Sequence, residues 1–538
     1  MAGFFNKLTG SERSEGSWSL RELARSFAAL RACEFLRGTG GPPVFPLRKT
    51  MGGPPMPQKF THSEVFRRIF ALSRVGKILR STSEPVNFWR AFSIAKRYKV
   101  RMDKVENKDG SPVRLRRPDR SQMEMVVQCP DELIPQNHEA RTIWRVCESQ
   151  DLSAFCEPIK ARDGVSGRNA TMPTLLVALW LYATVRGIGS ARELARRCRE
   201  SDPFKWLCGG VTLNYHTLSD FRVDHGPALD ALFTRILVTL VDKKLVKVYR
   251  ISQDGIRTRA CAGASSYRRE ERLGRLLEDA TKHVQELKKL LDDPEKSAGL
   301  SAKQKAARTR AARERQERVE QAIKRLPELK KKQEKLAKKK SQKEKEKLKE
   351  PRVSTTDAEA TVMKMANGGF NPAVNVQFAA DTESRAIVGV DVSGEGNDHH
   401  LAEPMRAQVE QRTGEKVHDH LIDGGFLVME EIETAAAQGV TLFVPPKPPR
   451  NKKQRGSEYE PRPGESPAIE DWRKRMGSDE GKEIYKLRAS TSETVNADLK
   501  THRGMNRMLV RGLAKAKCVA LWCALAYNVM HFAGALIT

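Results

Sequence analysis

The sequence predicts an α/β protein whose mixed sheet is interrupted by a helical hairpin and preceded by an all-α domain. Helical patterns fill residues 125–245, and alternating apolar residues mark a strand at 247–260 and four later strands. Heptad-spaced apolar residues lie between the first strand and the others. At 538 residues the chain is long enough for two or three domains with cores of their own.

The composition indicates an anionic partner. The net charge is +29, and a basic excess of this size usually accompanies binding to nucleic acid or another acidic surface. The nine cysteines form no CxxC pair and are odd in number, which argues against a zinc module and a secreted disulfide framework. We therefore expect a reducing cytoplasm. No Gly-rich nucleotide loop is present, so ATP use is not indicated.

The two ends of the chain carry little functional information. We interpret residues 1–110 as a basic N-terminal extension of low order, because the Gly/Pro-rich stretch 38–57 disfavours regular structure. No signal peptide is evident. Residues 518–538 are uncharged and about long enough to span a bilayer. Because they contain Asn528 and His531 and continue a basic amphipathic helix, we interpret them as a buried C-terminal helix rather than a membrane anchor.

Residues 111–245 predict a helical domain. The apolar run TMPTLLVALWLYATVRG is expected to be a buried helix, and Ser190 and Glu193 have the spacing of a capping box at the start of the next one. Thr217 and Asp220 form a second potential cap pair. Short basic helices joined by tight turns suit a helix-turn-helix that docks on DNA, although a domain that only packs would show the same pattern.

The strand at 247–260, KVYRISQDGIRTRA, is followed much later by the other strands of the expected mixed sheet. These are AVNVQFAAD (373–381), RAIVGVDVS (385–393), HDHLIDGGF (418–426) and GVTLFVPP (439–446). Helices are expected at about 398–411 and 428–438. We interpret Asp398 as the N-cap of the first of these helices rather than as part of a metal cluster with His399 and His400, and Asp357 as another N-cap.

Residues 268–350 interrupt the sheet with a predicted coiled-coil hairpin. Apolar residues from Leu273 to Leu291 step by four and three, which is a heptad seam, and DDPEKSAGLS (292–301) breaks it before a second helical run. Residues 301–350 hold 20 Lys/Arg and 8 Asp/Glu. Most of these charges are expected on a solvated helix face, and a subset could contact phosphates.

Three acids stand out by position. Asp254 lies inside the first strand, Asp423 lies where a later strand ends in a Gly pair, and Glu493 lies at the head of a basic helical stretch. A carboxylate in an apolar strand is costly to bury unless it is paired or metal-bound. Each acid alone also has a structural interpretation: turn chemistry for the two aspartates and ion pairing with Arg488 or Lys500 for Glu493.

The segments SQDGIRTRA, IDGGF and YKLRASTSETVNADLKTHRGMNRMLVRG, in this order, resemble the catalytic core of DDE-type bacterial insertion-sequence transposases. The stretch TMPTLLVALWLYATVRGIGSARELARRCRESDPFKWLCGG resembles the N-terminal helical domain of the same family, so that the resemblance covers roughly 125–535. It implies an RNase H-like catalytic domain formed by 246–267 and 351–538. It also implies that Asp254, Asp423 and Glu493 bind two Mg²⁺ ions, with Mn²⁺ as an alternative.

The resemblance also assigns DNA-positioning roles to Tyr485, Arg488 and Lys500. Lys500 is seven residues past Glu493, which places the two on nearly the same helix face. Arg488 departs from the commoner spacing by one residue, which turns it about 100° away from the position of that pattern if an α-helix is already formed there.

The sequence therefore predicts a DNA transposase that binds element ends and catalyses metal-dependent cleavage and strand transfer. The expected partners are the terminal inverted repeats, target DNA and a second copy of the chain, without a membrane and in the bacterial cytoplasm at the nucleoid. Two alternatives stay open. One is a metal-dependent nuclease without strand transfer, and the other is a non-catalytic DNA-binding protein from a decayed element.

Overall fold

The computed structural model describes residues 129–161, 169–338, 350–449 and 457–537, together with Ser121, Met123 and Gly164. The predicted extension 1–110 lies outside the described residues. From Met123 onward the chain belongs to one compact unit. The boundaries between the predicted domains inside this unit stay a prediction.

The first part of the unit is helical, as expected. Ser190 caps its helix by accepting a hydrogen bond from the Glu193 N–H at 3.4 Å. The expected cap pair Thr217–Asp220 is wrong, because Asn214 caps that helix one turn earlier, through the N–H of His216. The helices are α5 (Glu139–Ser149), α6 (Pro173–Val185), α7 (Ala191–Glu200), α8 (Asp202–Cys208), α9 (Tyr215–Asp224) and α10 (Gly226–Asp242), with 3-10 turns at Pro130–Leu133 and Ser153–Phe155.

The mixed sheet predicted from the alternating segments is present. In the described residues its order is β4-β5-β1-β7-β8, with β6 beside β5. Strand β5 is antiparallel to β1, β4 and β6, whereas β7 is parallel to both β1 and β8. The strands are β1 (Arg250–Arg259), β4 (Thr361–Lys364), β5 (Phe370–Asp381), β6 (Ile387–Ser393), β7 (Asp419–Leu421) and β8 (Thr441–Phe443).

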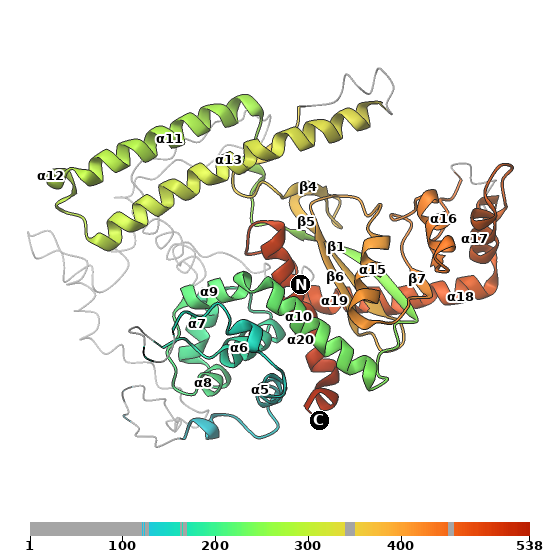
Figure 1. Ribbon diagram of the computed structural model, residues 1–538, viewed down its shortest axis with the longest axis horizontal. Helices are drawn as coiled ribbons and strands as arrows, with labels where there is room; N and C mark the ends of the chain where they lie inside the picture. Colours follow the sequence, from blue (N-terminus) through green and yellow to red (C-terminus); the bar gives the residue numbers. More distant parts are fainter. Residues whose placement is uncertain are drawn as a thin grey trace, which may run out of the picture. The chain divides into compact units, whose positions relative to one another are not determined.

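The helices between and after the last strands of the sheet pack around it (Figure 1). They are α15 (Ala402–Thr413), α16 (Met429–Ala437), α17 (Pro467–Gly477), α18 (Asp479–Arg488), α19 (Thr494–Thr501) and α20 (Leu513–Ile537), with a π-helical turn, η7 (Ala489–Glu493), between α18 and α19 and a 3-10 turn at Ser457–Tyr459. Helix α15 packs on β6 and α10, while α16 and α17 pack on β8. One apolar cluster therefore joins the N-terminal helices, α20 and the sheet, and a second fills the β7–β8 side.

Helix α20 lies within the larger of these cores. By length and composition alone it could cross a membrane, but most of it is buried against α5, α6, α9, α10 and β6. The polar residue in this apolar run has a structural explanation. Fully buried Asn528 accepts a hydrogen bond from the Ile387 N–H at 2.9 Å and donates one to the Ile387 carbonyl at 2.8 Å. The helix is thereby fixed to the first residue of β6.

Asp357 does not cap a helix that follows it, because β4 comes next. Its carboxylate instead accepts from the Gly512 N–H at 3.2 Å, and Glu359 accepts from the Leu513 N–H at 2.7 Å. Burial raises the pKa of Asp357. These two acids therefore satisfy the first amides of α20 from a distant part of the chain, which sequence spacing does not predict.

The segment expected to form a hairpin is helical and begins and ends at a small ladder. The elements are β2 (Tyr267–Arg268), α11 (Glu270–Asp292), α12 (Pro294–Ser297), α13 (Ala302–Lys338) and β3 (Val353–Ser354). Helices α11 and α13 lie side by side (Figure 1), and β2 pairs with β3. Of the predicted seam, Leu273 and Ala280 are buried, and Leu273 packs with Val319, Ala322, Leu326 and Val353.

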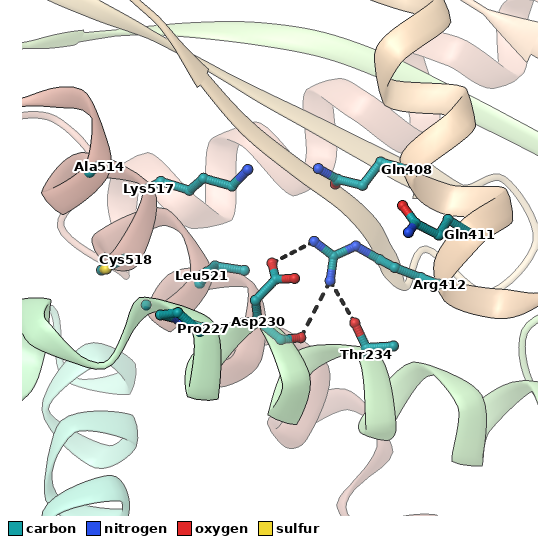
Figure 2. A pocket seen from close by; sticks show the side chains of 11 residues that line it. Pro227, Asp230, Thr234, Gln408, Gln411, Arg412, Ala514, Lys517, Cys518 and Leu521 are labelled. Atoms are coloured by element: carbon teal, nitrogen blue, oxygen red, sulfur yellow. Dashed lines mark hydrogen bonds and ion pairs between the residues drawn. The ribbon is translucent and has the colours of Figure 1, made fainter. Parts of the chain in front are cut away.

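A cavity of about 560 Å³ lies between α10, α15 and α20 (Figure 2). Arg412 of α15 crosses toward α10 and donates to the Asp230 carboxylate at 2.6 Å and to the Thr234 hydroxyl at 2.7 Å. None of the predicted site residues lines this cavity. We interpret these contacts as a polar connection between the helical segment and the sheet.

Replacing Asn528 with Leu tests whether its two hydrogen bonds hold α20 on the sheet. Leu is similar in size and more apolar, but it leaves the Ile387 N–H and carbonyl buried without partners. We expect a loss of about 2–5 kcal/mol in the free energy of unfolding, measured by denaturant titration. A variant as stable as wild type would show that these hydrogen bonds contribute nothing.

Candidate active site

The three predicted acids come from three elements that meet at one edge of β1. Asp254 lies in the middle of β1, and Asp423 lies two residues after Leu421, the last residue of β7. The parallel register pairs Ser252 of β1 with Leu421 of β7. Asp254 and Asp423 each come two residues later, so the register places them at the same level along the two strands. Glu493 closes the π-helical turn η7, which packs on β1 and β5.

A buried hydroxyl pair fixes the third element against the first. The Oγ atoms of Ser252 and Ser492 are 2.6 Å apart, and both residues are almost fully buried. Ser492 immediately precedes Glu493, and Ser252 lies two residues before Asp254 in the same strand. This contact therefore sets the distance between the strand and the helix that carry two of the acids.

Arg488 lies among all three carboxylates. Its Nη2 atom is 3.3 Å from Oδ1 of Asp254 and 4.0 Å from Oδ2 of Asp423, and its Nη1 atom is 3.9 Å from Oε1 of Glu493. The arginine side chain is 13% exposed. The structure thus brings the three acids together around one guanidinium, which offsets part of their mutual repulsion.

The condition under which Arg488 would turn away from the position of the commoner pattern does not hold, and η7 is the reason. A π-helical turn has hydrogen bonds from residue i to i+5 and contains one residue more than an α-helical turn. Arg488 and Glu493, which are five residues apart, therefore point to the same side. The π-helical turn thus accommodates the one residue by which the Arg488–Glu493 spacing exceeds the commoner pattern.

Burial and hydrogen bonds act on Asp254 in opposite directions. Burial raises the pKa of Asp254, Arg488 lowers it, and the nearby charge of Asp423 raises it again, with a net shift upward. The carboxylate accepts from the Gly255 N–H at 2.9 Å and from Nδ2 of Asn496 at 3.1 Å. Asp254 is consequently the acid of the three that is most in need of a positive partner.

Two of the predicted DNA-positioning residues, Tyr485 and Arg488, lie beside the acids. Burial raises the pKa of Tyr485, which also senses the charges of Arg488 and of the three acids. Lys500 lies half-buried on α19, and within the described ranges its ammonium forms no ion pair. Its cation is therefore available to a ligand, unlike that of Arg488.

Sequence reasoning missed a polar group next to these acids. The expectation that Asp398 caps a helix is wrong, because α15 begins later, after Leu401. Oδ1 of Asp398 instead accepts from Nδ2 of Asn375 and Nε2 of Gln377, both at 2.7 Å. The signal was two amides at alternate positions in the apolar strand AVNVQFAAD, which places both on one buried face.

The donors at this site fit a hard divalent cation in kind. Carboxylate oxygens are the ligands that Mg²⁺ prefers, and three are present beside further amide oxygens. In the part of the chain that the structure describes, no three metal-ligating side chains form a ready-made group that could hold an ion. Because the Arg488 guanidinium lies between the acids, binding a cation there requires this side chain to move.

Two family models match the chain. The model described as Transposase DDE domain matches residues 350–529, and the one described as Transposase domain (DUF772) matches residues 128–224. The first match includes Asp423 and Glu493, while Asp254 lies between the two matched ranges. Neither a curated protein nor a solved structure matches the chain. The DDE domain implies an RNase H-like fold, which agrees with the mixed sheet.

Replacing Asp254 with Asn tests the electrostatics of the site. Because the folded-state pKa of Asp254 is raised, its contribution to stability is present at acid pH and is lost as the pH rises through that value. In a buffer free of divalent cations at pH 7.5, we expect the variant to melt at a higher temperature than wild type. The difference should shrink as the pH falls, because protonation makes the Asp254 side chain neutral like that of the variant.

Glu493→Gln is the matched control for this experiment. The Glu493 side chain is 67% exposed, so its charge is well solvated and its removal should change the melting temperature much less. A lower melting temperature for Asp254→Asn at pH 7.5 would contradict a net unfavourable charge at Asp254.

Proposed function

The chain belongs to the DDE-type insertion-sequence transposases, and we propose that it cuts DNA at the ends of its own element and joins them to target DNA. The observation that carries this proposal is the meeting of Asp254, Asp423 and Glu493 around Arg488 on the elements that the family resemblance selects. Transposases are normally soluble DNA-acting proteins. We infer that this one works in the bacterial cytoplasm at the nucleoid.

Asp254, Asp423 and Glu493 would hold two Mg²⁺ ions, with Mn²⁺ as an alternative. When bound, such a pair of ions activates the attacking oxygen and stabilises the leaving oxygen of a phosphodiester. The side chains contribute oxygen donors from a strand, a strand end and a helix, so the position of each is set by backbone pairing. In the first reaction water attacks and a 3′-OH is released. In the second, this 3′-OH attacks a phosphodiester of target DNA and displaces the 3′-oxygen of the target strand, which leaves as a 3′-OH.

The basic residues around the acids would hold the DNA backbone. Arg488 is within 4.0 Å of all three carboxylates, so on release from them its planar guanidinium can reach a neighbouring phosphate. Lys500 supplies a second positive charge two turns from Glu493. Tyr485 offers a half-buried hydroxyl at the same site.

We propose that the remaining parts recognise and arrange the DNA. The helical domain, 111–245, includes the matched transposase domain and would bind element ends. The inserted hairpin, 268–350, would contribute phosphate contacts through part of its exposed Lys and Arg residues. A homodimer on paired ends would allow both ends to be processed together.

Two other functions share parts of this description. A metal-dependent nuclease without strand transfer would use the same acids, and a strand-transfer assay with paired terminal repeats separates it from a transposase. A non-catalytic DNA-binding protein from a decayed element would need no intact site. The grouping of all three acids favours a catalytic protein over this last alternative.

Neutralising each acid tests the proposed catalytic site. We expect Asp254→Asn, Asp423→Asn and Glu493→Gln each to reduce cleavage of element ends about 100-fold or more, since each removes a charged oxygen donor worth several kcal/mol. Binding to the same DNA, measured by fluorescence anisotropy, should persist. Glu383→Gln is the control, because Glu383 pairs with Lys247 on the surface. Full activity in any one of the three variants would remove that acid from the site.

Deleting Ser490 tests the role of the π-helical turn. Ser490 is an exposed residue inside this turn, which has one residue more than an α-helical turn. Its deletion should convert the turn to an α-helical one with Arg488 and Glu493 four residues apart, so that the two side chains still face each other. We expect the deletion to retain cleavage within about tenfold.

Deletion of Ala497, an exposed residue of α19, is the matched comparison. It should turn Lys500 by about 100° relative to Glu493 and reduce cleavage much more. Equal losses in the two deletions would contradict the proposed register.

A further inference from the structure

Asp398 lies in the connection from β6 to α15, but its carboxylate reaches back to the sheet beside the three acids. One oxygen, Oδ1, accepts two hydrogen bonds of 2.7 Å from the amides of Asn375 and Gln377. Both amide residues lie on β5 and are almost fully buried. The orientation of this carboxylate is therefore set by two rigid donors rather than by solvent.

The donors are themselves held in place. Oε1 of Gln377 accepts from Nε2 of Gln253 at 3.0 Å, and the same Nε2 donates to the Leu401 carbonyl at 3.1 Å. Gln253 is fully buried and immediately precedes Asp254 in β1. A continuous set of hydrogen bonds thus connects the strand that carries Asp254 to the Asp398 carboxylate.

The second oxygen of Asp398 is directed at the acid site. A Cβ atom placed on Gly425 would lie 3.5 Å from Oδ2 of Asp398 and 2.8 Å from Oδ1 of Asp423. The two carboxylates therefore approach the same small space. In the part of the chain that the structure describes, this Oδ2 has no hydrogen-bond donor and Asp398 has no ion-pair partner. An aligned carboxylate with one oxygen held and the other open is suited to bind a cation.

Glycine at two positions makes this approach possible. A Cβ atom on Gly255 would lie 2.5 Å from Nε2 of Gln377, 2.7 Å from Oδ1 of Asn375 and 2.8 Å from Oδ1 of Asp398. A side chain there would push the whole polar group away from the residue that follows Asp254. Oδ1 of Asn375 is also buried without a hydrogen bond. A water molecule carried by a cation at this site could supply the missing donor.

We propose that Asp398 is a fourth carboxylate of the active site, which binds a divalent cation through Oδ2 beside Asp423 while Asn375 and Gln377 hold Oδ1. The inference rests on the proposed function, because it adds a ligand to the metal site described there. A purely structural role for Asp398 would require only an oxygen that accepts the two amide hydrogen bonds. An asparagine at 398 offers such an oxygen, so this substitution separates the two roles.

The test is Mg²⁺ binding to the full chain without DNA, measured by isothermal titration calorimetry on wild type and on Asp398→Asn. We expect the variant to bind Mg²⁺ at least about tenfold more weakly, with a melting temperature in the absence of metal that is no lower than that of wild type. Asp391→Asn is the matched control, since Asp391 is a carboxylate of β6 that pairs with Lys517 of α20. Its affinity for Mg²⁺ should stay within about twofold of wild type.

Asp423→Asn distinguishes the two ways in which the idea can fail. If Asp423→Asn weakens Mg²⁺ binding and Asp398→Asn does not, the fourth-carboxylate assignment is overturned and the proposed function stands. If neither variant changes Mg²⁺ binding, the metal site itself falls. A measurement on the wild-type chain covers the case in which Asp398→Asn does not fold. Fe²⁺ with ascorbate and peroxide should cleave the backbone near 398 as well as near Asp423, and the absence of cleavage near 398 would overturn the assignment.

Discussion

The site depends on the repulsion among carboxylates that the fold gathers at the open edge of β1. Asp254, Asp423 and Glu493 all lie within 4.0 Å of the Arg488 guanidinium, and Asp398 approaches the same edge from the other side of Gly255. Like charges gathered around one side chain repel one another unless a cation or strong hydrogen bonds offset the repulsion. Strand pairing, the Ser252–Ser492 contact and the buried amides of β5 all hold these acids against that repulsion.

The parts of this arrangement that follow from periodicity were predictable. Alternation placed all five of the predicted strands, and position within or at the end of a strand identified Asp254 and Asp423. Glu493 and its basic neighbours came from a resemblance in motif spacing. The direction of Arg488 could be predicted only for the case of an α-helix, and nothing in the composition of ASTSE distinguishes a π-helical turn from an α-helical one.

The errors at Asp398 and Asp357 share one physical cause, which is that short polar residues can bond to partners far away in the chain. Asp398 and Asp357 both have the local look of helix caps. One bonds to amides of β5 and the other to the first amide of the segment that leads into α20, because tertiary contacts offer better-placed donors than the neighbouring backbone. Asn528 differs from these two residues. Its place in an apolar helix predicted that the helix is buried, but the sequence did not identify Ile387 as its hydrogen-bond partner.

The β2–β3 ladder has a consequence for how this chain can vary. Tyr267 pairs with Ser354 and Arg268 with Val353, so the long insertion leaves and re-enters the fold at a single clasped point. Beyond this ladder the arm also contacts the body, because Nζ of Lys332 on α13 lies 2.6 Å from Oε1 of Glu395. Because the ladder holds the two ends of the arm together, the arm can change in length over evolution while β1 and β5 keep their pairing.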